Sequence, residues 1–270
     1  MQVKSTDTLL KLPSASLLVS HGSRDPRPQM EVEELAALVV MKLGGRDRQL
    51  HQNRFLQSAG NAPVAAIEAA PPLVGTACLE LAPLPLHRQI QAFGAKAIAS
   101  GYHRLHIVPL FLLPGVHVME DIPGEVAIAQ SASGSDLTLD IRPHLGSHPG
   151  LSRLFATQVN FVGAEAKILL SHGSRRPHGN QPVEALAATL GAIPAYWSVL
   201  PSLEMQVKAL VNRGCEKICI LPYFLFAGGI TDAIAQVVDL LSQQFPAVEF
   251  KLANALGASH ELADLILDLI

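Results

Sequence analysis

One short motif occurs twice in this chain, and the duplication constrains the fold more than any other feature. Residues 16–26 read SLLVSHGSRDP and residues 167–177 read KILLSHGSRRP, so the block SHGSR recurs at an offset of 151 residues. In both copies apolar residues follow the block at i, i+3, i+4 and i+7, beginning at Val32 and Val183, which is the pattern of one helix face. The chain is therefore predicted to contain two copies of one folding unit.

Two further blocks recur in the same order. GYHRLHIVPLFL at 101–112 pairs with GCEKICILPYFL at 214–225, and HLGSHPGL at 144–151 pairs with ALGASHEL at 255–262. Their smaller offsets mean that the first half is longer. The excess falls near 41–74, which is rich in Gly, Gln, Asn, Arg and Ala and which we interpret as a surface insertion.

Each half alternates apolar strands with amphipathic helices. Near-continuous apolar runs predict buried strands at 16–20, 106–110 and 138–141 in the first half and at 168–171, 218–221 and 248–252 in the second. A further short strand is expected after the first helix of each half, so the runs at 106–110 and 218–221 are the third strands. This alternation is typical of a parallel sheet covered on both faces. The predicted fold class is α/β, with two similar lobes, each a parallel β-sheet flanked by helices.

The predicted division places an N-terminal lobe at 1–160 and a C-terminal lobe at 161–270. Ligands of open parallel sheets bind beyond the carboxyl ends of the strands, so two facing lobes are expected to enclose a cleft there. We also expect the apolar positions of the last helix, from Glu261 onward, to pack on the neighbouring lobe.

Composition excludes several classes of function. The 270 residues are 49% hydrophobic, with a formal net charge of −3 and no Lys/Arg-rich run, which argues against nucleic acid or an anionic membrane as partner. Three cysteines without a CxxC motif make a disulfide scaffold or a thiolate zinc site improbable. The N-terminus lacks the apolar segment of a secretory signal, so we expect a cytoplasmic protein.

His21 stands directly after the first predicted strand, in the block Ser20-His21-Gly22-Ser23-Arg24. A turn of small residues between strand and helix is where this architecture places functional groups, and Gly22 permits a sharp turn or a close approach. The alternative is a turn in which Ser23 or Asp25 caps the helix and His21 has no chemical role.

A difference between the halves favours a functional site. His117, in the segment after the third strand, is replaced by Ile230 in the second copy. Glu80, at the second strand end, faces 196–198, and no carboxylate lies between Ile193 and Pro201. The second half keeps only His172, so one duplicated site is predicted to be intact and the other dismantled.

Two imidazoles and a carboxylate suit a borderline divalent ion such as Co²⁺, Fe²⁺, Ni²⁺ or Zn²⁺. Three protein ligands with open positions make a site that can pass its metal onward. Taken alone, His117 and Glu80 are each better explained as an ordinary loop or strand-end residue, whereas for His21 the two interpretations are equally supported. Together, at matching strand ends, the three residues favour a site. Glu120 and Asp121 are interpreted either as acceptors that orient His117 or as caps of a helix that opens near Pro123, with capping preferred for one of them.

Several segments together resemble the sirohydrochlorin chelatases, within the class II tetrapyrrole chelatases. These are the HGSR turn, the Leu-Glu-Leu strand end around Glu80, and the PLFL…PG-His-x-x-Glu-Asp-Ile-Pro segment that contains His117. The resemblance runs from about Ser16 to the end of the chain and includes the long, internally duplicated form. Val116 departs from the family's pattern, in which a second glycine is common.

The resemblance implies an enzyme, a lyase that inserts Co²⁺ or Fe²⁺ into sirohydrochlorin for cobalamin or siroheme biosynthesis. It implies that His21, Glu80 and His117 are both catalytic and metal-binding. The metal is a substrate, so no permanent cofactor is expected. Sirohydrochlorin is a polycarboxylate tetrapyrrole, and the candidate groups that contact it are Ser20, Gly22, Ser23, Arg24, Arg27 and Arg175, with Arg176 beside them. For the arginines, ordinary surface charge is the alternative.

Three other functions remain open. A non-catalytic metal-binding or delivery protein would use the same ligands, and a chelatase acting on another tetrapyrrole, such as protoporphyrin, would share the fold. A nucleotide-binding α/β protein is disfavoured because no phosphate-binding glycine motif follows a strand. The sequence leaves open cobalt against iron, a role for His172, and monomer against homodimer.

Overall fold

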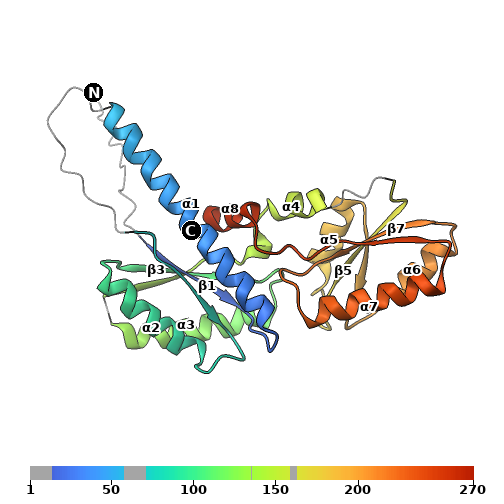
Figure 1. Cartoon of the computed structure of the whole chain (residues 1–270). Helices are drawn as coiled ribbons and strands as arrows, with labels where there is room; N and C mark the ends of the chain where they lie inside the picture. Colours follow the sequence, from blue (N-terminus) through green and yellow to red (C-terminus); the bar gives the residue numbers. More distant parts are fainter. Residues whose placement is uncertain (1–13, 58–70, 135, 159–162) are drawn as a thin grey trace, which may run out of the picture.

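The structure is a computed structural model that describes residues 14–57, 71–134, 136–158 and 163–270. Two four-stranded parallel sheets lie side by side along the molecule, one in each half (Figure 1). The strands of the first sheet are β1 (Ala15–Ser20), β2 (Val74–Cys78), β3 (Arg104–Pro109) and β4 (Thr138–Ile141), in the order β2-β1-β3-β4. Those of the second are β5 (Ala166–Ser171), β6 (Ile193–Tyr196), β7 (Lys217–Pro222) and β8 (Glu249–Leu252), in the order β6-β5-β7-β8. The predicted fold class is confirmed.

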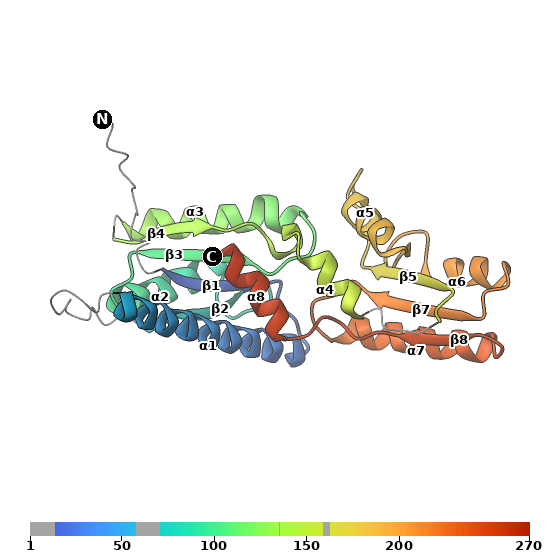
Figure 2. The same cartoon turned by 90° about the horizontal axis from the view of Figure 1, so that it is seen from above.

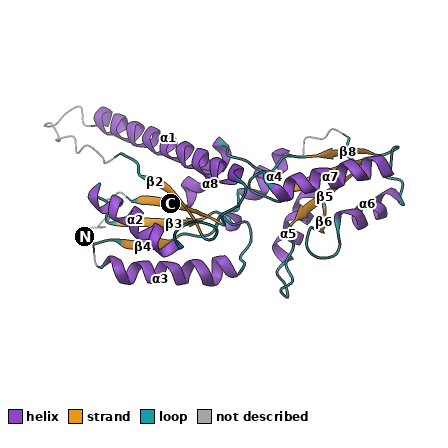
Figure 3. Ribbon diagram, turned by 60° about the horizontal axis from the view of Figure 1, so that its bottom comes forward, coloured by secondary structure: helices purple, strands orange, loops and turns teal. Residues whose placement is uncertain are grey.

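Helices cover both faces of each sheet (Figure 3). In the first half they are α1 (Pro26–Gln57), α2 (Leu86–Ala99), the π-helical turn η1 (His117–Asp121), α3 (Ile122–Ser133), the 3₁₀ turn η2 (Leu145–Ser147) and α4 (Leu151–Gln158). In the second they are α5 (Gln181–Leu190), α6 (Leu203–Val211), α7 (Gly229–Gln244) and α8 (His260–Leu269).

The central strands are mostly apolar because both of their faces are buried. On β1, Leu17 and Val19 face the core formed with α2 and α3, whereas Leu18 faces the core formed with α1. All three side chains are at most 1% exposed. Alternate residues of a strand point to opposite faces, so a strand between two helical layers favours apolar residues on both faces.

The last helix of each half packs on the other half. Helix α8 lies along α1, and α4 contacts α5 (Figure 2). Leu262 and Ile266 of α8 are fully buried in the same core as Leu35 of α1. The expectation that the final helix packs on the neighbouring lobe is confirmed, and the exchange joins the two lobes through one continuous core.

Part of the predicted insertion near 41–74 is helical. Helix α1 continues to Gln57, and residues 58–70 lie outside the described part of the chain. No helix among the described residues is long and apolar enough to cross a membrane.

Candidate functional site

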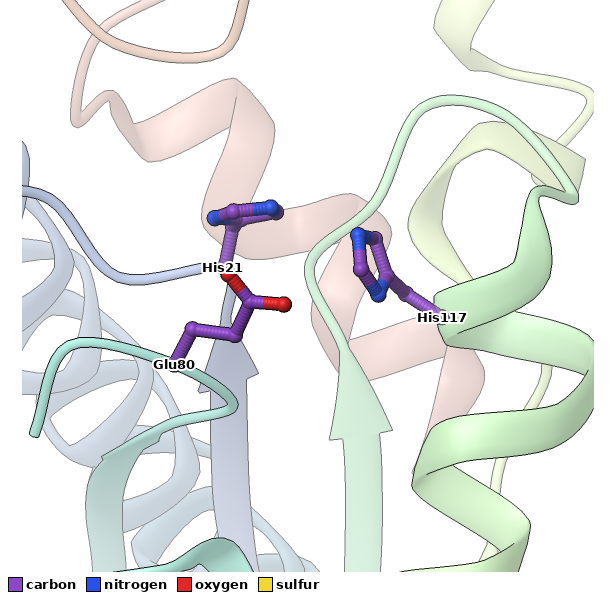
Figure 4. Close-up of side chains that lie close together, drawn as sticks. All are labelled: His21, Glu80 and His117. Carbon is purple, nitrogen blue, oxygen red and sulfur yellow. The ribbon is translucent and has the colours of Figure 1, made fainter.

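Three strand ends bring His21, Glu80 and His117 together. Each residue has one ligand atom within 4.8 Å of those of the other two. His21 follows β1 directly, Glu80 lies two residues beyond β2, and His117 opens η1 after β3. Figure 4 shows the three side chains converging at the carboxyl edge of the first sheet. Within the described residues no other group of His, Cys, Asp and Glu meets the same criterion.

The turn after β1 fits closely against the turn after β2. The Glu80 backbone N–H donates to the His21 carbonyl at 2.9 Å. Gly22 has φ +97°, and a Cβ atom there would collide with the Glu80 carbonyl group. A glycine is needed here for both reasons, because any other residue is strained at positive φ and carries a Cβ atom.

The capping interpretation of this turn is also correct for one residue. The Asp25 carboxylate accepts from the Arg27 backbone N–H at 3.0 Å, as an N-cap does at the start of α1. His21 is not part of this cap. Its ring lies edge-on to that of His117, with 4.8 Å between the centroids, and Phe111 flanks both rings. Capping and a functional role for His21 are therefore compatible.

The segment that carries His117 is a π-helical turn. The Nδ1 atom of His117 lies 2.7 Å from Oδ2 of Asp121, one turn further on. Asp121 makes no capping hydrogen bond to α3, and its carboxylate contacts His117 instead, so of the two interpretations Asp121 fits that of an acceptor that orients His117. Glu120 lies 3.8 Å from Arg176 of the second lobe. Val116 has helical φ and ψ, which a valine adopts without strain.

The structure also fixes which residues of the second half correspond to the site. Ser198 donates its backbone N–H to His172 at 2.9 Å, as Glu80 does to His21. Ser198 therefore occupies the position of Glu80, which sequence comparison had located only within 196–198. The second half retains one of the three candidate ligands, because Ile230 takes the place of His117.

A cavity of about 250 Å³ lies between the two lobes, with His21 in its lining. The first lobe contributes Ser20, Gly22 and Ser23, which were predicted to contact substrate. The second lobe contributes residues of the β7–α7 loop, among them Phe224 and Ile230. The expected cleft at the carboxyl ends of the strands is present.

None of the predicted arginines lines this cavity. Arg24 and Arg175 are exposed. Arg27 donates to Asp25 and, across the lobe boundary, to Asp232, each at 2.5 Å. The Arg27 guanidinium holds the pKa of both carboxyl groups below its usual range. Its two carboxylate partners here are protein side chains, and its contact with substrate stays a prediction.

Sequence analysis missed two residues that bridge the lobes at this point. Asp232 binds Arg27, and Glu31 of α1 accepts from the Ala227 backbone N–H at 3.2 Å. Neither residue belongs to a repeated block or a recognisable motif. The pairing of distant charges depends on how the lobes dock, for which the sequence carries no local signal.

Comparison with known proteins identifies the family. The CbiX family model matches residues 15–161 and again residues 166–270. The chain belongs to the CbiX family. Both matches together span nearly the whole described chain, and the two segments coincide with the two sheets, so the family resemblance seen in the sequence is confirmed.

Curated relatives and solved structures agree with this assignment. A sirohydrochlorin cobaltochelatase of Priestia megaterium is 25% identical over 266 residues, covering 93% of this chain and 76% of the relative. A sirohydrochlorin ferrochelatase of the same organism is 26% identical, covering 80% and 85%. The structure of SirB from Bacillus subtilis with Fe³⁺ superposes with a TM-score of 0.69 at 21% identity, covering 96% of this chain and 94% of that one. The SirB structure with cobalt gives a TM-score of 0.65 at 20% identity, with the same coverage. These structural matches establish the shared fold.

Proposed function

We propose that this CbiX-family protein is a sirohydrochlorin chelatase that inserts Co²⁺ or Fe²⁺ into the macrocycle, for cobalamin or siroheme biosynthesis. The observation that carries the proposal is the convergence of His21, Glu80 and His117 beside a cavity between the lobes. The names of the two curated relatives specify the tetrapyrrole and the two metals.

The three side chains suit a metal that is a substrate and not a resident cofactor. Two imidazoles and one carboxylate bind borderline divalent ions without selecting cobalt or iron. His21 and Glu80 are exposed and His117 is partly exposed, so an ion held there keeps open coordination positions. Such a site can release its ion to the ring nitrogens of a macrocycle.

Metal insertion requires two kinds of exchange. The two pyrrole N–H protons leave the macrocycle, and the ion gives up protein and water ligands for four ring nitrogens. A neutral histidine nitrogen can hold the ion or accept one of these protons. We assign this chemistry to His21 and His117, with Glu80 as the third ligand and an alternative proton acceptor.

The cleft is the proposed site of the tetrapyrrole. Its apolar wall from the β7–α7 loop and the small residues around Gly22 offer a surface for a flat ring. Arg24 and Arg175 are exposed, one in the turn after β1 and the other in the turn after β5, and can pair with ring carboxylates. In this proposal the first lobe performs the chemistry, and the second lobe, with Ser198 and Ile230, completes the binding surface.

The test is anaerobic metallation of sirohydrochlorin, followed by its visible absorption, with Co²⁺ and Fe²⁺ offered separately. The proposal predicts a rate well above that of the enzyme-free reaction with at least one of the ions. No acceleration with either ion, combined with stable Co²⁺ binding that sirohydrochlorin leaves undisturbed, would instead favour a metal-delivery protein. Competition between sirohydrochlorin and protoporphyrin distinguishes the proposed enzyme from a chelatase that prefers another tetrapyrrole.

A further inference from the structure

We propose that Asp121 is a positioning residue that fixes the ring orientation and the tautomer of His117, within the π-helical turn that contains both residues. The inference rests on the proposed function, because it concerns how one metal-exchanging group is held. From the sequence, Asp121 could be either an acceptor that orients His117 or a helix cap.

The contact itself sets the position of a proton. A carboxylate only accepts hydrogen bonds, so the 2.7 Å contact requires that Nδ1 of His117 carries the hydrogen and donates it to Asp121. In the neutral ring, Nε2 then has a free lone pair. A histidine whose other nitrogen donates to a carboxylate is held in one tautomer and one orientation, and it is a more basic ligand.

The two halves differ by one residue at this turn. The third strands match at an offset of 113, since Leu110 and Tyr223 donate equivalent backbone hydrogen bonds to Val19 and Leu170. Beyond the turn the buried residues match at an offset of 112, as Ile122 matches Ile234.

Val126 with Val238 and Ala129 with Leu241 continue this register along α3 and α7, and all are buried. The first half therefore contains one extra residue between Leu110 and Ile122. The π-helical turn His117–Asp121 lies in this interval, whereas α7 opens as an ordinary α-helix. A single inserted residue is the usual origin of a π-helical turn, and such turns are frequent at functional sites.

The second half lacks counterparts of both His117 and Asp121. Ile230 stands in place of His117, and the two residues that can correspond to Asp121 in either register are Ala233 and Ile234. The half that lacks the histidine thus lacks its acceptor and the π-helical turn as well. This joint occurrence favours one functional unit over an incidental surface pair.

Asp121 is also the acceptor that remains available at this turn. The neighbouring carboxylate, Glu120, points toward Arg176 across the cleft, with 3.8 Å between the charged atoms. His117 has 34% of its side chain exposed, so the contacts of its ring with His21 and Phe111 hold it only on part of its surface. The bond to Asp121 supplies the missing constraint.

The test compares Asp121→Ala and Asp121→Asn in the full-length protein by titration with Co²⁺ alone, followed by the visible absorption of the bound ion. Removing a carboxylate partner of a ligating histidine weakens metal binding by about 10- to 100-fold. We expect that loss in Asp121→Ala and a smaller one in Asp121→Asn, because the asparagine oxygen still accepts from Nδ1–H. The KM for sirohydrochlorin should stay close to that of the wild type in both variants.

The control is Asp264→Ala. Asp264 lies on α8, where its exposed carboxylate pairs with Lys42 of α1, and its removal should leave Co²⁺ affinity unchanged. Unchanged Co²⁺ affinity in Asp121→Ala would overturn the inference, while wild-type turnover would leave the proposed function intact. Equal losses in Asp121→Ala and Asp121→Asn would assign the effect to charge and also overturn it. A wild type that neither binds Co²⁺ nor metallates sirohydrochlorin would refute the proposed function itself.

Discussion

At the scale of single residues, Gly22 controls how closely two candidate ligands approach. Its φ of +97° and the nearby Glu80 carbonyl leave no space for a side chain. Gly173 is its counterpart in the second half, with φ +84°, but the atoms around it are side-chain atoms of Val199 and Tyr196. Side chains adjust more easily than a hydrogen-bonded backbone, so the two glycines form a matched pair for experiment.

We expect Gly22→Ala to abolish Co²⁺ binding and Gly173→Ala to preserve it. Both substitutions should lower the free energy of unfolding, by about 1–3 kcal/mol, since each places alanine at positive φ in a crowded turn. Only the first has to displace the backbone of Glu80. Urea unfolding and Co²⁺ titration of the two variants check this, and equal Co²⁺ affinity in both would contradict it.

Residue identities were predictable where the two halves could be compared. His117 and Glu80 emerged because Ile230 and a segment without carboxylates replace them, and His21 because its motif recurs. The partner of Arg27 was not predictable. A guanidinium near a helix start suits a substrate carboxylate or a protein carboxylate equally well, and only the docking of the lobes brings Asp232 to it.

At the scale of elements, the π-helical turn distinguishes the candidate active half from the degenerate one. The sequence predicted a helix opening near Pro123, but the helical path begins at His117. The extra residue could not be placed from the sequence. The repeat offset falls from 113 to 111 between two blocks, but this fall does not show where between them the additional residues lie. The exchange of α4 and α8 between lobes was predictable for α8 alone, from its apolar face.

Deleting Met119 should convert this turn to the shorter form seen at the start of α7. The Met119 side chain is 63% exposed, so the deletion removes little buried area. His117 and Asp121 would then be three residues apart in a different helical register, which changes the geometry of their present 2.7 Å contact. We expect Co²⁺ affinity to fall at least about 10-fold, with a melting temperature near that of the wild type. Retained affinity in a folded deletion variant would show that the extra residue is unimportant.

At the scale of the whole molecule, the two lobes share a core, and Tyr223 is central to it. Its hydroxyl donates to the Leu112 carbonyl of the first lobe at 3.2 Å, and its ring packs against Phe155 with 5.0 Å between the centroids. Burial raises the pKa of Tyr223 to about 12. The junction of the lobes is therefore expected to weaken at alkaline pH.

The sign follows from proton binding. Unfolded tyrosine loses its proton near pH 10, whereas folded Tyr223 keeps it to about pH 12. Between these values the unfolded state binds fewer protons, so the free energy of unfolding falls as the pH rises, by about 2–3 kcal/mol at the upper limit. Burial, together with the nearby Glu184 carboxylate, also raises the pKa of Tyr196 to about 12, which acts in the same direction.

Tyr223→Phe should therefore lose less stability between pH 9 and pH 11.5 than the wild type. At pH 8 the variant should be less stable by about 0.5–1.5 kcal/mol, because it lacks the hydrogen bond to Leu112. Urea unfolding followed by the fluorescence of Trp197 measures both. Identical pH dependence of the two proteins would show that Tyr223 is not protected by its surroundings.

The central claim is that one lobe of a duplicated protein performs metal insertion. The most direct test is the initial rate of anaerobic sirohydrochlorin metallation in the wild type, His21→Ala, His117→Ala and His172→Ala. We predict losses of about 100-fold or more, the range for removing a group that transfers protons or binds metal, in the first two variants. His172→Ala should keep nearly the wild-type rate. Equal losses in His21→Ala and His172→Ala, or wild-type rates in all three variants, would contradict the assignment of the reaction to the first lobe.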